Sequence, residues 1–267
     1  MIQSPFLARQ ERFDVVGSTN DVVRGWLADG VAEVCLAVAD EQSAGRGREG
    51  RTWTAPAGHA LLLSLGFRPI WLSPDRVWRL AAVTSLAMAD AAEEVAGLAP
   101  GTIRLKWPND LVVESNGHAR KLAGVLGETD GLGTDDPRAV VGIGINADWP
   151  AEEFPPELAD DMTSLRAVAG ERRIDTAALL EAFTDKLEAM IEQLRNGEFD
   201  EAGWAQRELT NGRLVRLIGH DAGEEVVTAL RVDPASGALV VADAGGPGSE
   251  RNVVSGEIHH LRLDRGV

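Results

Sequence analysis

The chain of 267 residues has one cysteine, a shortage of basic residues and no long apolar run. Its single cysteine, Cys35, excludes an internal disulfide, which suits a reducing compartment. Cys35 lies in the apolar segment Glu-Val-Cys-Leu-Ala-Val-Ala, so we expect a small core side chain there rather than a catalytic thiol. No apolar stretch reaches membrane-spanning length, and the N-terminus lacks the basic and apolar stretches of a signal peptide. We therefore expect a cytoplasmic protein with no membrane partner.

The shortage of basic residues gives the chain a strong negative charge. Lys and Arg total 26 against 42 Asp and Glu, a formal net charge of −16. The mean field of such a chain repels phosphate, which argues against nucleic-acid binding by the chain as a whole. The composition, 44% hydrophobic and 25% charged, is that of an ordinary globular protein with one large domain or a main domain and a small appendage.

What the chain does contain is a concentration of arginine in one short segment. Residues 45–53 read Gly-Arg-Gly-Arg-Glu-Gly-Arg-Thr-Trp. Glycines let backbone N–H groups and guanidinium groups come close to an anionic ligand. The segment also matches the G-x-G-x-x-G pattern of dinucleotide-binding folds, in which the glycines open a helix. Pro56 and Gly58 discourage a helix here, so we reject that interpretation and expect a site for a small phosphate ligand.

Hydrophobic periodicity predicts strands interspersed with helices over the first 210 residues. A helix is expected after Ser18, and another from Pro74 to about Gly97. The turn Ser115-Asn116-Gly117 predicts a hairpin. The remaining expected helices span 162–169, 175–195 and 200–208, and the expected strands span 11–16, 33–39, 61–67, 103–107, 110–114, 119–128 and 139–145.

The pattern changes after Asn211-Gly212. Residues 213–263 show short alternating strands and no helical periodicity. Turns are expected at Pro234-Ala-Ser-Gly237 and at Gly245-Gly246-Pro247-Gly248. We therefore predict two domains, at 1–210 and 211–267, the second a small all-β module.

Three further motifs follow the arginine segment, and each has an ordinary structural explanation when taken alone. Lys-Trp-Pro-Asn-Asp at 106–110 is common turn chemistry, and Arg-Lys-Leu-Ala-Gly-Val-Leu at 120–126 reads as an edge strand with solvated cations. Gly-Ile-Gly-Ile-Asn at 142–146 is a strand with two glycines on one face, which leaves room for something flat. Their order and spacing carry more information than any one of them.

Together, the four motifs resemble those of the biotin–protein ligase (biotin–[acetyl-CoA-carboxylase] ligase) family. Ser18-Thr19-Asn20 and Gln42 extend the resemblance towards the N-terminus, and Ser255-Gly256-Glu257-Ile258 resembles the family's C-terminal part. The family's fold is α+β, with a mixed central sheet flanked by helices in a catalytic domain like that of class II aminoacyl-tRNA synthetases. A small C-terminal SH3-like β barrel follows it. The resemblance implies this architecture for the present chain.

The resemblance also implies an ATP-dependent ligase. Such enzymes activate biotin as biotinyl-5′-AMP, release pyrophosphate and transfer biotin to a lysine of a biotin carboxyl carrier domain of acetyl-CoA or acyl-CoA carboxylase. Joining two anions requires cationic groups. Lys121 is expected between the biotin carboxylate and the α-phosphate, and Arg48 is expected to close the loop over the adenylate, both as catalytic residues. The implied ATP and adenylate contacts are Arg46, Arg48, Arg51, Lys106, Asn109, Asp110 and Asn146.

Biotin's ureido ring offers two N–H donors and one acceptor, so its site needs short polar groups of both kinds. Ser18, Thr19 and Gln42 correspond to the family's ureido contacts, although the two hydroxyls are equally typical of helix capping. Trp53 is either a plain core aromatic or, with Gly124 and Gly144, a wall of the slot for the valeryl chain. Further biotin contacts implied by the resemblance are Gly45, Arg46 and Lys121.

ATP brings Mg²⁺, which prefers oxygen ligands and keeps several waters. No metal cage built by the protein is expected, and Mg²⁺ is placed near Asp110 and Asn146. The five histidines show no spacing that predicts zinc.

The chain differs from the family in two respects, and two alternative functions remain open. Ser18 lies too near the N-terminus for the helix-turn-helix domain of some bacterial members, so we expect a monofunctional ligase without nucleic-acid binding. Glu49 stands where the loop often carries arginine, and it either pairs with a neighbour or weakens the local field. The rivals are a lipoate–protein ligase, which lacks the first two motifs, and a non-catalytic biotin or adenylate sensor, which would not need Lys121, Arg48 and Asp110.

Overall fold

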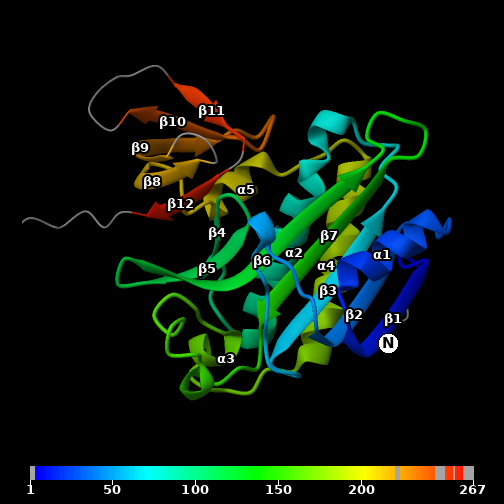
Figure 1. Ribbon diagram of the computed structural model, residues 1–267, viewed down its shortest axis with the longest axis horizontal. Helices are drawn as coiled ribbons and strands as arrows, with labels where there is room; N and C mark the ends of the chain where they lie inside the picture. Colours follow the sequence, from blue (N-terminus) through cyan, green and yellow to red (C-terminus); the bar gives the residue numbers. More distant parts are fainter. Residues whose placement is uncertain (1–3, 220–222, 244–249, 255, 261–267) are drawn as a thin grey trace, which may run out of the picture.

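The computed structural model describes residues 4–219, 223–243, 250–254 and 256–260. Its main sheet has seven strands in the order β1-β2-β3-β7-β6-β5-β4 (Figure 1). β1 and β2 are parallel and all other neighbours are antiparallel, which confirms the predicted mixed sheet. The strands are β1 (Arg9–Val16), β2 (Cys35–Gln42), β3 (Ala60–Phe67), β4 (Ile103–Lys106), β5 (Asp110–Ser115), β6 (His118–Asp130) and β7 (Arg138–Asn146).

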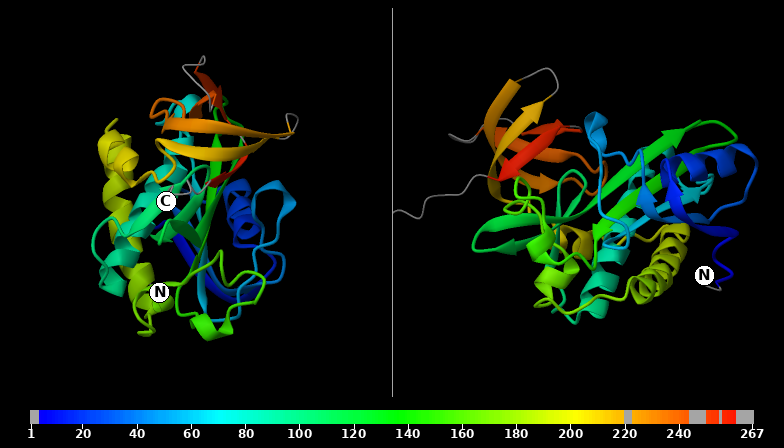
Figure 2. Two further views of the ribbon diagram at one scale, coloured as in Figure 1. Left: turned by 90° about the vertical axis from the view of Figure 1, so that its left-hand side faces the viewer. Right: turned by 60° about the horizontal axis from the view of Figure 1, so that its bottom comes forward.

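Helices cover both faces of this sheet. α2 (Trp78–Ala96) and α4 (Thr176–Arg195) pack against each other on one face, and α1 (Thr19–Ala28) lies on the other (Figures 1 and 2). The short helices α3 (Leu165–Val168) and α5 (Glu201–Arg207) lie outside this pair. In the part of the chain that is described, no helix is long and apolar enough to cross a membrane.

Local sequence signals account for most element boundaries. The hairpin between β5 and β6 turns at Asn116 and Gly117, both with positive φ, as the Asn-Gly pair predicts. Gly97 ends α2 in the left-handed conformation. The prediction for Pro74 was wrong in detail: it begins a 3₁₀ turn (Pro74–Arg76), and α2 starts only at Trp78. The helix expected at 162–169 is shorter than predicted and is limited to α3.

Cys35 is a core residue, as predicted. It is buried with Val23, Trp26 and Leu27 in the layer between α1 and the sheet. Burial raises the pKa of its thiol to about 11, so the group stays protonated at neutral pH. A nucleophilic thiolate is therefore excluded at this position.

The C-terminal strands form a second, five-stranded antiparallel sheet at one end of the molecule (Figure 1). Within the described residues this sheet is open, with β11 and β12 at its edges, so the predicted barrel is not confirmed. The expected turn at 234–237 is present, while the one at 245–248 lies outside the described residues. The strands are β8 (Arg213–Gly219), β9 (Gly223–Val232), β10 (Leu239–Asp243), β11 (Arg251–Val253) and β12 (Glu257–His260).

The turn at 234–237 joins the C-terminal sheet to the rest of the protein. Trp107 donates its indole N–H to the carbonyl of Gly237 at 3.2 Å, and Arg79 donates to the carbonyl of Pro234 at 3.0 Å. Gly237 has a φ of 71°, and a Cβ there would lie 2.9 Å from the ring of Trp78. A glycine is required because both its conformation and its close approach exclude a side chain.

Glu208 is a buried acid near the same junction. Its backbone pairs with Leu105 of β4, and its Oε2 has no hydrogen-bond partner among the residues that are described. Burial raises the pKa of its carboxyl group to about 8, although the nearby Arg104 charge acts in the opposite direction. Glu208 is therefore largely protonated at neutral pH.

Glu208 makes a specific contribution to the pH dependence of stability. Its carboxyl pKa is raised in the folded chain from a reference value of 4.5 to about 8. The resulting stabilisation of the folded state is fully present below about pH 4.5 and is lost as the pH rises through about 8. Relative to Glu208→Gln, the wild type should lose roughly a few kcal/mol of unfolding free energy between pH 5 and 9. Urea unfolding of both proteins at several pH values measures this difference. Parallel pH profiles would show that Glu208 is not buried as described.

Candidate functional site

A cavity of about 150 Å³ lies between the 45–53 segment, the start of α1 and the strands β5, β6 and β7. It brings together all but two of the residues predicted to form the site. The exceptions are Gly45 and Asn146. The predicted residues that line it are Ser18, Thr19, Gln42, Arg46, Arg48, Arg51, Trp53, Lys106, Asn109, Asp110, Lys121, Gly124 and Gly144.

The 45–53 segment folds back on itself as a small hairpin. Arg46 pairs with Thr52 in an antiparallel bridge, and the Trp53 N–H donates to the Gly45 carbonyl at 3.0 Å. Gly45 itself is outside the cavity lining, but a Cβ there would lie 2.4 Å from the Trp53 carbonyl oxygen. Gly45 therefore shapes the hairpin by allowing its two arms to approach.

Glu49 lies at the tip of this hairpin. It has a φ of 57°, in the left-handed region, and Gly50 follows with a φ of 73°. Its carboxylate pairs with Arg51 at 3.5 Å. Of the two alternatives left open by the sequence, the structure therefore shows pairing with a neighbour, and the Glu49 side chain contributes to the folded tip.

Trp53 covers a ledge of two glycines. Gly124 of β6 is paired directly with Gly144 of β7, and Cβ atoms added there would lie 3.3 Å and 2.7 Å from the Trp53 ring. The ring therefore packs on bare backbone and forms one wall of the cavity. Its Nε1 is buried and has no hydrogen-bond partner among the described residues.

The space predicted beside the glycines of β7 is filled by protein. Trp53 occupies it at Gly144, and the amide of Asn20 occupies it at Gly142, where a Cβ would be 2.2 Å from Asn20 Oδ1. The expectation of room for something flat beside these glycines is confirmed, and residues distant in sequence fill that room. The flat groups against these glycines are an indole ring and a side-chain amide.

The cavity lining is locally cationic in an acidic protein. It contains five cationic side chains and two carboxylates, those of Glu49 and Asp110. Lys121 Nζ lies 2.7 Å from Asp110 Oδ1 and 5.5 Å from the centroid of the Trp53 ring. The contact with Asp110 offsets part of the charge of Lys121 and holds its ammonium group against the indole face.

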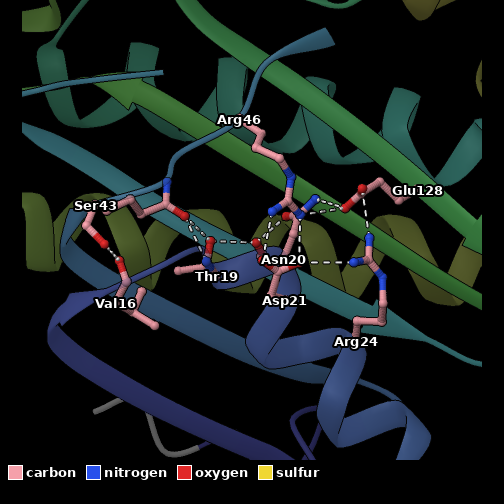
Figure 3. A network of polar contacts seen from close by, with 10 residues as sticks. Val16, Thr19, Asn20, Asp21, Arg24, Ser43, Arg46 and Glu128 are labelled. Atoms are coloured by element: carbon pink, nitrogen blue, oxygen red, sulfur yellow. Dashed lines mark hydrogen bonds and ion pairs between the residues drawn. The ribbon is translucent and has the colours of Figure 1, made fainter. Parts of the chain in front are cut away.

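Arg46 is held by acidic residues of two elements (Figure 3). Both of its terminal nitrogens lie 2.7 Å from the Asp21 carboxylate, and one lies 3.6 Å from Glu128. The hydrogen bonds from Arg46 lower the pKa of Asp21 and keep that carboxyl ionised. Arg24 completes the group through ion pairs with Asp21 and Glu128. An anionic ligand must therefore compete with these carboxylates for Arg46.

Arg48 connects the hairpin to the C-terminal part of the chain. Its guanidinium donates to the Gly256 carbonyl at 3.4 Å. Gly256 and Ile258 also line the cavity. The C-terminal sheet therefore contributes to the site, together with the main sheet.

The hydroxyls at the start of α1 are not consumed by helix capping. Ser18 is the N-cap residue by conformation, but its side chain makes no capping hydrogen bond. Thr19 donates its backbone N–H to Gln42 Oε1 at 2.7 Å, and its Oγ1 lies 3.0 Å from the same oxygen. Both side chains face the cavity, which favours the ligand role over the capping role.

The two asparagines predicted near the nucleotide differ in position. Asn109 lines the cavity and donates its amide to the Val125 carbonyl at 2.7 Å. Asn146 is buried, does not line the cavity and donates its amide to the Thr163 carbonyl at 2.9 Å. No group of three or more His, Cys, Asp or Glu able to hold a metal occurs in the described ranges.

Sequence reasoning missed several residues of the site. Asn20 and Gly142 line the cavity and touch each other, and Gly256 and Ile258 reach it from the C-terminal sheet. Asn20 belongs to the Ser-Thr-Asn run that carries part of the family resemblance, but only Ser18 and Thr19 of that run were predicted to bind the ligand. Nothing local in the sequence indicates that residue 256 meets residue 48, because that contact depends on how the two sheets pack.

Comparisons with known proteins agree with this geometry. Residues 13–146 match the biotin/lipoate A/B protein ligase family. The biotin--[acetyl-CoA-carboxylase] ligase of Mycobacterium tuberculosis is 34% identical over 259 residues, which cover 94% of this chain and 90% of that protein. The chain belongs to this ligase family.

Solved structures of family members have the same fold. The biotin protein ligase from Aquifex aeolicus in complex with biotin and ATP superposes with a TM-score of 0.75 at 26% identity, over 96% of this chain and 99% of that one. The biotin protein ligase from Leishmania major in complex with biotinyl-5-AMP gives a TM-score of 0.60 at 26% identity, with coverage of 96% and 99%. This ligase family member therefore shares with them a fold that extends over 96% of its chain.

The ledge beneath Trp53 has a direct test. Gly144→Ala should destabilise the ligase by about 1–3 kcal/mol, because the new methyl overlaps the indole ring. The same substitution should cost much less in a Trp53→Ala background, where the ring is absent. Urea unfolding of the four proteins of this cycle measures the coupling. Gly25→Ala, which adds a methyl to open space on α1, is the control. Additive effects would show that Trp53 does not rest on Gly144.

Proposed function

We propose that this chain is an ATP-dependent biotin–protein ligase. It activates biotin as biotinyl-5′-AMP with release of pyrophosphate, and transfers the biotinyl group to a lysine of a biotin carboxyl carrier domain of acetyl-CoA or acyl-CoA carboxylase. The observation that carries the proposal is the cavity, whose lining combines five cationic side chains with the short polar side chains of Ser18, Thr19 and Gln42 and with the indole ring of Trp53. Such a lining suits two anions and an apolar chain, and the family membership supports the same reaction.

In the first step, a carboxylate oxygen of biotin attacks the α-phosphorus of ATP, and the bond to the departing pyrophosphate breaks. The two reactants are both anionic, so their approach depends on cations already in place. We assign this role to Lys121, whose ammonium group lies against Trp53 beside Asp110. Arg48 is assigned to the adenylate, and Arg51 and Lys106 complete the phosphate-facing group.

Biotin is assigned to the part of the cavity between α1 and Trp53. Ser18, Thr19 and Gln42 supply short polar groups for the ureido ring. The valeryl chain runs along Trp53 over Gly124 and Gly144, which places the carboxylate towards Lys121. Arg46 serves this ligand only after exchanging at least part of its pairing with Asp21.

In the second step, the carrier's lysine amine attacks the acyl carbon of the mixed anhydride, AMP leaves, and the amine loses a proton. The acyl donor is already activated, so positioning and carbonyl polarisation suffice. No covalent enzyme intermediate is required. This agrees with the buried, protonated thiol of Cys35.

Several finer assignments belong to the same proposal. Mg²⁺ would enter with ATP and be held chiefly by phosphate oxygens, with the Asp110 carboxylate in the cavity as a protein oxygen ligand. The catalytic domain ends near residue 210, and the C-terminal sheet belongs to an SH3-like barrel. The enzyme works in the cytoplasm without binding nucleic acid, in keeping with its charge of −16.

The reaction is tested by isotope exchange between pyrophosphate and ATP. Purified protein with ATP and Mg²⁺ should catalyse exchange when biotin is added, because adenylate formation is reversible. Lipoate should give at least tenfold less, since its dithiolane ring lacks the ureido donors and acceptor. Exchange with lipoate but not with biotin would make the chain a lipoate–protein ligase. Binding of biotin without any exchange would make it a sensor.

Lys121→Ala should reduce adenylate formation by about 10²–10³-fold, because it removes a cation from the point where the two anions meet. Its unfolding midpoint should change little, since the Lys121 side chain is partly exposed. Lys186→Ala is a matched control: Lys186 pairs with Glu94 on the helical face, far from the cavity. Normal biotinylation of a carrier domain by the Lys121 variant would remove this residue from the mechanism.

A further inference from the structure

Ser64 is a fully buried polar residue directly behind the cavity wall. It lies on β3, has no exposed surface and does not line the cavity. Its Oγ is 2.7 Å from Thr19 Oγ1 and 2.5 Å from Asn20 Oδ1. Ser64 thus connects a hydroxyl assigned to the ligand with the amide of Asn20.

A charge fixes the orientation of the Asn20 amide (Figure 3). Asn20 Nδ2 donates to Glu128 Oε2 at 2.6 Å. Arg24 lies 2.7 Å from the same carboxylate and Arg46 lies 3.6 Å from it. An ionised carboxylate only accepts hydrogen bonds, so the NH₂ group of Asn20 must face Glu128. The oxygen of the amide must therefore face Ser64.

The hydroxyl protons in this group are too few for its contacts. Three oxygen–oxygen contacts occur in a row: Gln42 Oε1 to Thr19 Oγ1 at 3.0 Å, Thr19 to Ser64, and Ser64 to Asn20 Oδ1. Only Thr19 and Ser64 contribute hydroxyl protons, one each. One of the three contacts therefore has no proton between its two oxygens.

The acceptor at the buried end of the row, Asn20 Oδ1, must receive one of the two hydroxyl protons. Asn20 Oδ1 is enclosed, because Asn20 is 4% exposed and packs against Gly142. A buried acceptor without a donor is costly, so Ser64 gives its proton to Asn20. Gln42 Oε1 already accepts the Thr19 backbone N–H at 2.7 Å, so the Thr19 hydroxyl donates to Ser64, the nearer oxygen at 2.7 Å. No hydroxyl proton then lies between Thr19 Oγ1 and Gln42 Oε1, and each keeps a lone pair available to a ligand. Both of these residues line the cavity.

We propose that Ser64, Asn20 and Glu128 are positioning residues that set the ligand specificity of the cavity by directing the lone pairs of Thr19 and Gln42 towards a ligand N–H group. Thr19 donates to Ser64, Ser64 donates to Asn20, and Asn20 donates to the Glu128 carboxylate. A ring N–H of the ligand then supplies a proton to the oxygens of Thr19 and Gln42. This inference rests on the proposed binding of biotin, whose ureido ring carries such N–H groups. A ring in which oxygen replaces that N–H meets two acceptors and no donor.

The test is Ser64→Ala, with pyrophosphate exchange measured for biotin and for an analogue whose ureido ring carries oxygen in place of one N–H, prepared as both regioisomers. In the wild type the better regioisomer should have a KM at least tenfold above that of biotin. In the variant, the KM for biotin should rise about tenfold, the loss of roughly one hydrogen bond, while the KM for that analogue stays within twofold. The kcat and the KM for ATP should also stay within twofold. A purely structural role would lower activity with both ligands together.

Two further variants keep the test decisive. In Ser64→Cys the side chain keeps its shape, but the thiol is a poor hydrogen-bond donor. This variant should therefore lose the discrimination between biotin and the analogue as Ser64→Ala does, and it serves as the test if Ser64→Ala folds poorly. Thr84→Val, which removes a buried hydroxyl bonded only within α2, should leave both KM values unchanged. Unchanged discrimination in both Ser64 variants, or equal rises in KM for both ligands, would overturn the inference. Absence of biotin-dependent exchange in the wild type would instead overturn the proposed function.

Discussion

The direct pairing of Gly124 with Gly144 across β6 and β7 is the constraint on which the site depends. Two adjacent residues without side chains expose the backbone of the sheet, and the Trp53 ring packs on that surface. The position of Trp53 in turn holds the end of the arginine hairpin and gives the Lys121 ammonium group an aromatic face. A side chain at either glycine would move the indole ring, and with it the wall of the cavity.

Three cations of the site, Lys121, Arg46 and Arg48, have partners within the protein. Lys121 pairs with Asp110, Arg46 pairs with Asp21 and Glu128, and Arg48 reaches the Gly256 carbonyl. This pairing limits the cost of concentrating positive charge in one place. It also means that ligand binding exchanges one set of partners for another, so affinity depends on Asp21 and Glu128 as well as on the arginines themselves.

Both sheets share in this arrangement. The main sheet carries the paired glycines Gly124 and Gly144, and the chain leading into β12 supplies the partner of Arg48. The hydroxyls of Ser18 and Thr19 come from the start of α1. The junction between the sheets is made by Trp107, which follows β4, and by the turn containing Gly237. Since Trp107 lines the cavity together with Lys106 and Asn109, the packing of the C-terminal sheet bears directly on the phosphate-facing side.

The sequence by itself determined which residue types are concentrated where: the arginine–glycine hairpin, the Asn-Gly turn, the glycines of β7 and the helix-forming segments all follow from short-range preferences. Through their resemblance to a known ligase family, the sequence motifs also predicted half of the residues that line the cavity. Only the tertiary structure decided that Trp53 and Asn20 fill the space beside Gly144 and Gly142, that Asn146 bonds to the Thr163 carbonyl, and that Ser64 joins Thr19 to Asn20. Those outcomes depend on strand register and on packing between distant segments, and no local pattern encodes which distant atom will lie within 3 Å of another.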